Sequence, residues 1–326
     1  MRLLVIRSKA TLKIKGRATL VIKIGDRISE KALRDIDSVL VIGSGISIDS
    51  AVPPSLSLHN IPLAILAKDS ISILMNPIVT RYNNYRRLQY QLDKIKALSI
   101  ALRYIEAKIK GMINILKYHG VEPPNIPAPP QDIEDADTYE AEIRLWESTA
   151  SSLLWSNLQS LLDPNILEKL HIEYSFKGRK PRHPDPFNKT LSVMYATIYS
   201  LTTKALIAAG LDPTYGFLHR TRYSTPLTFD YSEMFKPIAI EATISLINNE
   251  GLPELDEGEL TRPWVNTAIK YLYDYLTLKH KDTKKTPYQH LYLKAFCLAK
   301  HLEGKCREDR LTVVWSRAQY RRRKRT

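Results

Sequence analysis

The chain has 326 residues, of which 44% are hydrophobic and 25% are charged, a balance that excludes a disordered or fibrous protein and leaves room for two domains with separate cores. Its net charge of +14 and isoelectric point of about 9.5 favour a polyanionic partner, with nucleic acid ahead of a membrane surface. A basic protein without such a partner is the alternative.

The N-terminal segment does not have the pattern of a signal peptide, because Arg2, Arg7 and Lys9 interrupt its apolar residues. The apolar run at 61–67 is much shorter than the roughly 20 residues that span a bilayer. We therefore expect a cytoplasmic protein that is neither secreted nor inserted in a membrane.

Short β-prone runs dominate the first part of the chain. Strands are predicted at 2–6, 11–16, 18–24, 38–45 and 62–67. A short helix is expected at 29–35 or 55–59. Gly43 and Gly45 lack the third glycine of a phosphate-binding loop, so a tight turn is the preferred interpretation there. Residues 1–76 are predicted to form a small β-rich, sandwich-like domain.

The periodicity becomes helical from residue 81, and Asn76 and Pro77 precede the change, so we expect a linker at 77–84. The proline-rich and acidic stretch at 121–137 is predicted to be a loop. The fold class is therefore α+β, with a larger all-α domain at 85–326. Its later helices are predicted at 138–160, 164–170, 186–209, 230–249, 262–278 and 288–302.

The C-terminal region contains both cysteines and a basic tail. Cys297 and Cys306 lack zinc-knuckle spacing, and neither a disulfide framework nor a metal site is indicated for them, which suits a reducing cytoplasm. Six basic residues and no acid lie in 317–326, which indicates a tail that contacts phosphates or one that only increases solubility.

His219, Asp230 and Glu233 are the first candidates for chemistry. On a helix, Asp230 and Glu233 would face the same way, and with an imidazole they offer ligands suited to manganese or magnesium. The same spacing is that of a capping box, with Asp230 as the N-cap, and this alternative needs no metal. Glu147 is a candidate third ligand on an amphipathic helix, although an exposed glutamate is the common case.

Four motifs resemble those of the CRISPR-associated integrase and endonuclease family of spacer acquisition, the Cas1 family. They are "ESTASSLLW" from Glu147, "HPDPFN" around Asp185, "AGLDPTYGFLH" ending at His219, and "PLTFDYSEMFKP", which contains Asp230 and Glu233. The combination is specific although no single motif is, and weaker similarity extends to both ends of the chain.

The resemblance implies that Glu147, His219 and Glu233 are metal ligands for Mn²⁺ or Mg²⁺ and that Asp230 is an accompanying catalytic acid. The sequence departs from the family pattern at Ser148, Leu154 and Lys236, which replace glycine, tyrosine and arginine. We expect the first two replacements to alter packing around Glu147, and the third to exchange a forked donor for a point charge.

The implied activity is metal-dependent phosphodiester transesterification that inserts spacer DNA into a CRISPR array, and hydrolysis when water attacks, as part of prokaryotic antiviral immunity. A non-catalytic nucleic-acid-binding scaffold with the same fold is the alternative. Implied partners are double-stranded and branched DNA, a second copy of the chain paired through the β-rich domains, and a small dimeric adaptor, Cas2. Candidate DNA contacts are Arg220, Arg222, Tyr223 and Lys236, with the basic loop at 177–184 nearby.

Overall fold

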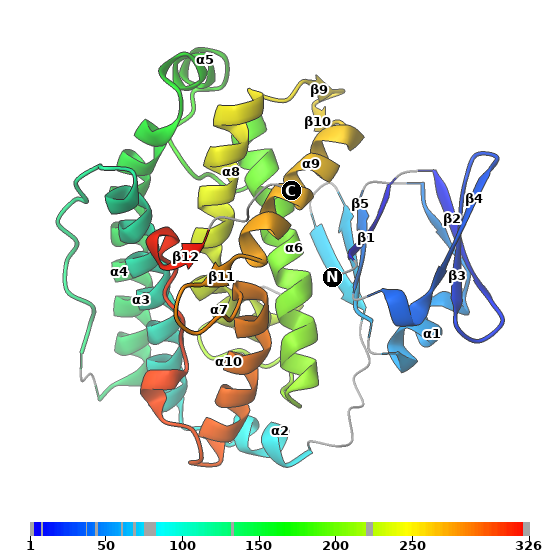
Figure 1. Ribbon diagram of the computed structural model, residues 1–326. Helices are drawn as coiled ribbons and strands as arrows, with labels where there is room; N and C mark the ends of the chain where they lie inside the picture. The colour runs from blue at the N-terminus through cyan, green and yellow to red at the C-terminus, as the bar shows by residue number, and fades with distance from the viewer. Residues whose placement is uncertain are drawn as a thin grey trace.

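Two four-stranded sheets form the N-terminal part of the protein (Figure 1). The computed structural model describes residues 3–321 except 8, 37, 43–44, 60, 68–69, 75–82, 132–133 and 220–223. One sheet has the order β1 (Leu3–Arg7), β5 (Ser38–Ile42), β7 (Leu63–Ala67) and β8 (Ser70–Leu74). The other has the order β4 (Arg27–Ala32), β3 (Thr19–Ile24), β2 (Ala10–Lys15) and β6 (Ser47–Ile48). The predicted β-rich, sandwich-like start of the fold is confirmed.

The sheets differ in their pairing. β1, β5 and β7 pair in parallel, and β8 is antiparallel to β7. β2, β3 and β4 form an antiparallel meander, with short β6 parallel to β2. Apolar residues from both sheets and from helix α1 (Val52–Leu58) share one core, which includes Ile6, Leu12, Leu20, Val39 and Val52. This core fixes the two sheets face to face.

The prediction of a helix at 29–35 was wrong for most of these residues. Residues 27–32 form strand β4, and only Leu33–Asp35 adopt one 3-10 turn. β4 pairs with β3 across a two-residue turn at Gly25, which has a φ of +58°. Every residue of β4 except Ala32 is exposed, so the strand lacks the alternation that identifies a half-buried strand. The other short helix, expected at 55–59, overlaps α1, which starts three residues earlier and ends at Leu58.

Helices make up most of the rest of the chain, as predicted, and the proline-rich stretch at 121–131 has no regular structure. The long helices are α2 (Asn83–Tyr90), α3 (Lys94–Tyr118), α4 (Ala136–Leu158), α5 (Pro164–Tyr174), α6 (Pro186–Ala208), α8 (Lys236–Glu250), α9 (Arg262–Leu276) and α10 (Pro287–Leu302). Most of the predicted linker, 77–82, lies outside the described residues, so the domain bounds 1–76 and 85–326 stay a prediction.

The helix predicted to start at Asp230 begins earlier. α7 (Pro226–Ser232) leads through a 3-10 turn, η4 (Glu233–Phe235), directly into α8. Pro226 stands at the first helical turn and Thr225 is the N-cap residue, so the capping-box interpretation of Asp230 was wrong. Asp230 instead lies one turn inside a buried helix.

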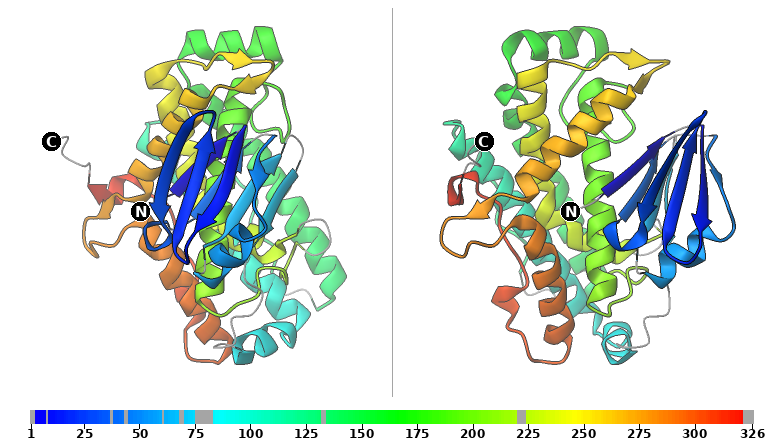
Figure 2. Two further views of the ribbon diagram at one scale, coloured as in Figure 1. Left: turned by 90° about the vertical axis from the view of Figure 1, so that its right-hand side faces the viewer. Right: turned by 45° about the vertical axis from the view of Figure 1, so that its right-hand side comes forward.

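Helix α6 lies between the other helices and the first sheet, and it contacts α8 as well as β5 and β7 (Figures 1 and 2). By length and composition α6 could cross a membrane, but 83% of its apolar window is buried inside the protein, as in a core helix. Val193 of α6 packs with Val265 and Ile269 of α9 against Leu40 and Ala64 of the first sheet. The β-rich part therefore docks on α6 and α9.

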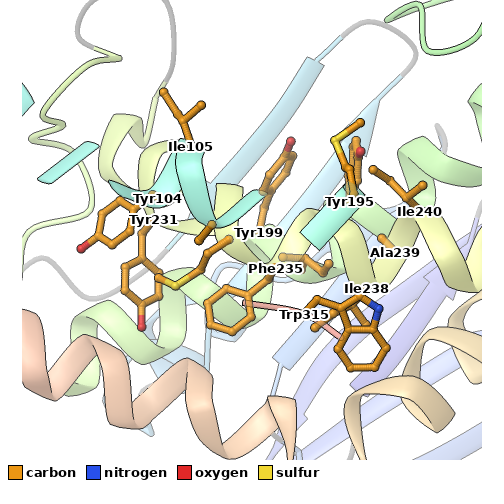
Figure 3. Close-up of a cluster of buried hydrophobic side chains, with 14 of the residues drawn as sticks. Tyr104, Ile105, Tyr195, Tyr199, Tyr231, Phe235, Ile238, Ala239, Ile240 and Trp315 are labelled. Atoms are coloured by element: carbon orange, nitrogen blue, oxygen red, sulfur yellow. The ribbon is translucent and has the colours of Figure 1, made fainter. Parts of the chain in front are cut away.

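The core around α3 is rich in aromatic side chains (Figure 3). The rings of Tyr104 and Tyr231 meet edge to face with centroids 5.4 Å apart, and Phe235 lies 5.8 Å from Tyr231. These contacts hold α3 against α7 and η4. Because aromatic pairs add packing energy beyond their buried area, the segment that carries Asp230 and Glu233 is firmly seated.

Residues 303–321, here called the C-terminal strap, cross back over the helical core. Trp315 donates from Nε1 to the buried Glu241 at 2.5 Å, and its carbonyl accepts from Asn114 of α3 at 2.9 Å. A disulfide joins Cys297 of α10 to Cys306 of the strap, with Cα atoms 5.6 Å apart, so the expectation of no disulfide was wrong. The chain reverses at Gly304 after α10 ends, which brings the two cysteines together despite nine residues of separation.

Candidate metal and nucleic-acid site

Asp230 organises the loop that carries His219. Its carboxylate accepts hydrogen bonds from the backbone N–H groups of Phe217, Leu218 and His219 at 2.6, 3.1 and 3.0 Å. The same carboxylate pairs with Nδ1 of His219 at 2.5 Å. Asp230 is 2% exposed, so these bonds satisfy a buried charge. A neutral ring that donates from Nδ1 to this carboxylate carries its lone pair on Nε2, the arrangement found in metal-ligating histidines.

Only glycine fits at position 216 of this loop. A Cβ atom there would lie 2.1 Å from the carbonyl oxygen of His219 and 2.5 Å from Cβ of Pro226. The backbone of the loop can therefore fold closely over Asp230.

Two side chains from other helices hold the same loop. Gln89 of α2, fully buried, donates to the carbonyls of Asp212 and Tyr215 at 2.8 and 2.7 Å and accepts from the N–H of Asp212 at 2.9 Å. Arg144 of α4 donates to the carbonyl of Leu218 at 2.8 Å. His219 is thus positioned by α2, α4 and α7 together.

A buried lysine connects the two glutamates. Lys108 of α3 forms an ion pair with Glu147 of α4 and lies with Nζ 2.9 Å from Oε2 of Glu233. Lys236 forms an ion pair with the other oxygen of Glu233, Oε1. Glu147 and Glu233, which are distant in sequence, therefore face one ammonium group.

Three neighbouring side chains act on the charge of Glu233. Burial alone would raise the pKa of Glu233, but Lys108, Lys236 and His219 outweigh it and lower that pKa to about 2. Burial would lower the pKa of Lys108, yet Glu147 and Glu233 hold it above its usual value. At neutral pH Glu233 is therefore an ionised carboxylate, and Lys108 is an ammonium group.

Two aromatic rings and the side chain of Arg179 lie beside Lys236. Its Nζ is 5.5 Å from the ring centroid of Tyr195 and 6.0 Å from that of Tyr199, both on α6. The guanidinium of Arg179 lies 5.4 Å from the ring centroid of Tyr195. Burial raises the pKa of both phenols, so they remain neutral. Arg179 and Lys236 thus place two positive groups around one ring next to Glu233.

The "HPDPFN" motif holds the loop that carries Arg179. Asp185 caps α6 by accepting from the N–H of Asn188 at 2.7 Å, and it pairs with Nδ1 of His183 at 2.6 Å. The side chain of Asn188 accepts from Arg179 and from the N–H of Lys180, both at 3.0 Å. The motif therefore acts here by positioning the basic loop.

The donor set suits a hard divalent cation, because it combines two carboxylates with an imidazole fixed by a third carboxylate. Oε2 of Glu233 is buried and accepts no hydrogen bond in the described part of the chain, since Lys108 is close enough for an ion pair but is not aligned for a hydrogen bond. Within that part, however, no three His, Cys, Asp or Glu side chains are arranged as a ready-made metal site. Glu147 and Glu233 both face Lys108, which lies between them.

The departures from the family pattern differ in their consequences. Ser148 is exposed, so the expected change in packing around Glu147 was wrong for this residue. Leu154 is fully buried in the helical core. Lys236 pairs with Glu233 through one ammonium group, where the arginine of the family pattern would offer a forked donor.

Three of the predicted DNA contacts, Arg220, Arg222 and Tyr223, lie outside the described residues. The sequence reasoning missed Lys108, Gln89 and Arg144. A signal existed for Lys108, because it occupies a position on the apolar face of α3 together with Tyr104, Ile105 and Met112, where a charge needs a partner.

Comparisons with known proteins identify the family of the chain. The family model for CRISPR associated protein Cas1 matches residues 3–277. A protein of Saccharolobus solfataricus named CRISPR-associated endonuclease Cas1 2 is 30% identical over 222 residues, which are 67% of this chain and 66% of that protein. CRISPR-associated endonuclease Cas1 of Hyperthermus butylicus is 28% identical over 298 residues, 83% of this chain and 86% of that protein. This chain thus spans just under two thirds of the first relative and more of the second.

Solved structures share the fold. A casposase bound to integration product has a TM-score of 0.77 and 23% identity, covering 100% of this chain and 96% of that chain. A Cas6-RT-Cas1–Cas2 complex contains a chain with a TM-score of 0.73 and 18% identity, covering 97% of this chain and 36% of that one. At these identities the likeness shows the architecture alone.

Proposed function

Because the chain belongs to the Cas1 family of CRISPR associated proteins, we propose that it is a metal-dependent DNA endonuclease and integrase that inserts spacer DNA into a CRISPR array. The observation that carries the proposal is that Glu147 and Glu233 face one buried ammonium group, while the imidazole of His219, held by Asp230, is close enough to act electrostatically on Glu233. The relatives named as endonucleases and the casposase bound to integration product support it.

The proposed ligands are Glu147, His219 and Glu233, for Mn²⁺ or Mg²⁺. A bound divalent cation supplies positive charge that polarises a phosphoryl oxygen and favours ionisation of the attacking hydroxyl. Asp230 holds His219 in one tautomer and one orientation, so the ring needs no reorganisation during the reaction. A 3′-hydroxyl as nucleophile gives strand transfer, and water gives cleavage.

DNA is proposed to approach over the basic rim of the site. Arg179 and Lys236 flank Tyr195, and Asn188 fixes the loop that carries Arg179. Arg220, Arg222 and Tyr223, which precede α7 directly, are proposed as further phosphate or base contacts. Contacts of this type make affinity fall steeply with salt.

We propose three partners for the protein in the cytoplasm of a prokaryote. Double-stranded and branched DNA would occupy the rim. A second copy would pair through residues 1–76, where β4 offers an exposed edge. A Cas2 adaptor is supported by the structural neighbour that contains Cas1 and Cas2.

The test is strand transfer on a branched DNA that mimics a half-integrated spacer. We expect product with Mn²⁺, none with chelator, and none for Glu147→Ala or His219→Ala. A matched control is Glu142→Ala, an exposed glutamate of the same helix. Product in both site variants would place the chemistry elsewhere, and DNA binding without product from the unmodified protein would favour the scaffold alternative.

A further inference from the structure

Lys108 occupies the space between the two proposed carboxylate ligands. It projects from α3, its residue is 6% exposed, and it pairs with Glu147 and with Oε2 of Glu233. A cation bound by both carboxylates would need these same oxygens at about 2.0–2.6 Å. The ammonium group and such a cation cannot both occupy this position.

We propose, building on the metal site proposed above, that Lys108 is an internal competitor of the metal. In the metal-free protein its ammonium neutralises Glu147 and Glu233 and keeps the site assembled. Divalent cation binding displaces the ammonium from between the two carboxylates. Lys108 is thus a positioning residue that makes the site stable without metal and weakens its affinity for metal.

The two lysines of the cluster are not equivalent in this respect. Lys236 pairs with Oε1 of Glu233 and lies by the rings of Tyr195 and Tyr199. Lys108 faces Oε2, the oxygen that accepts no hydrogen bond from the described residues. A cation can therefore take the place of Lys108 at Oε2 while Lys236 keeps its partner.

Displacing the ammonium group of Lys108 by a divalent cation changes the charge that a phosphodiester substrate meets. Glu147, Asp230 and Glu233 carry three negative charges, and Lys108 and Lys236 carry two positive charges. Counted without the imidazole, the formal charge of these five side chains is minus one before a divalent cation binds and plus one afterwards. The loaded site, with a released ammonium group at its edge, attracts a phosphodiester, whereas the metal-free site does not.

The experiment is Mn²⁺ titration by calorimetry, together with melting temperatures in EDTA and in Mn²⁺, on the full chain. Lys108→Met keeps the length of the side chain and removes its charge. We expect this variant to bind Mn²⁺ about tenfold more tightly or better, because a repelling charge is gone. We also expect a lower melting temperature in EDTA and a larger increase on adding Mn²⁺ than in the unmodified protein. Lys110→Met is the matched control, an exposed lysine of the same helix that pairs with Glu106.

Unchanged or weaker Mn²⁺ binding by Lys108→Met would overturn the proposal. If the single variant does not fold, Lys108→Gln takes its place, because it leaves a neutral polar side chain beside both carboxylates. Tighter Mn²⁺ binding by Lys108→Gln than by the unmodified protein supports competition, and equal binding refutes it. If the proposed metal site itself is wrong, the result is different: His219→Ala and Glu233→Gln, made in the protein that keeps Lys108, would then leave Mn²⁺ binding unchanged.

Discussion

Asp230 contacts His219 twice, accepting from its backbone N–H at 3.0 Å and pairing with its Nδ1 at 2.5 Å. Asp230→Asn keeps the size of the side chain but puts an N–H₂ group where one of the acceptors stood. We expect about 10–100-fold weaker Mn²⁺ binding, because an orienting partner of a ligand is lost. Calorimetric titration measures this. Affinity equal to that of the unmodified protein would show that His219 is oriented by other contacts.

Gly216→Ala is expected to destabilise the protein by about 3 kcal/mol, because the new Cβ would lie 2.1 Å from the His219 carbonyl oxygen. Gly25→Ala is the control, since that turn has a φ of +58° but no atom within 4 Å of the added carbon. Its cost should be about 1 kcal/mol. Denaturant unfolding of both variants measures the difference, and similar costs would contradict close packing at the loop.

Gln89→Leu removes three buried hydrogen bonds to Asp212 and Tyr215. We expect a loss of about 2–4 kcal/mol in stability and a fall in strand transfer, because backbone groups of the His219 loop lose their partners. Gln91→Leu, an exposed neighbour, is the control. Melting curves and the branched-DNA assay test the prediction. A stable variant with full activity would mean that Gln89 does not position the loop.

His290 of α10 gives the fold a pH dependence. Burial lowers its pKa from 6.5 to about 4, and the positive charges of Lys294, Lys285 and His280 add to the effect. The unfolded chain therefore takes up the proton first as pH falls, and the contribution of His290 to stability declines between about pH 6.5 and 4.

His290→Gln should accordingly lose less stability between pH 7 and pH 5 than the unmodified protein does. His59→Gln, at an exposed histidine after α1, is the comparison. The measurement is the free energy of unfolding by denaturant at both pH values. Equal losses in His290→Gln and the unmodified protein would show that another group carries the acid sensitivity.

The sequence revealed the β-rich start, most of the long helices and four of the clustered side chains, since apolar periodicity and the motifs around Glu147, His219, Asp230 and Glu233 are local signals. It did not reveal β4, because an edge strand exposed on both faces has no alternation. Nor did it reveal the disulfide or the pairing of Lys108, which depend on chain reversal and on helix packing. The sequence shows the charge of Lys108 on the apolar face of α3, but the partners of Lys108 lie 39 and 125 residues downstream, on α4 and η4.

The C-terminal strap has a consequence for the kinetics of folding. Asn114 of α3 bonds to the carbonyl of Trp315 across a separation of 201 residues, and Trp315 also bonds to Glu241 of α8. Contacts this distant in sequence form late, because the entropy of closing the intervening chain must be met first. Helix α3, which carries Lys108, therefore gains its last support near the end of folding.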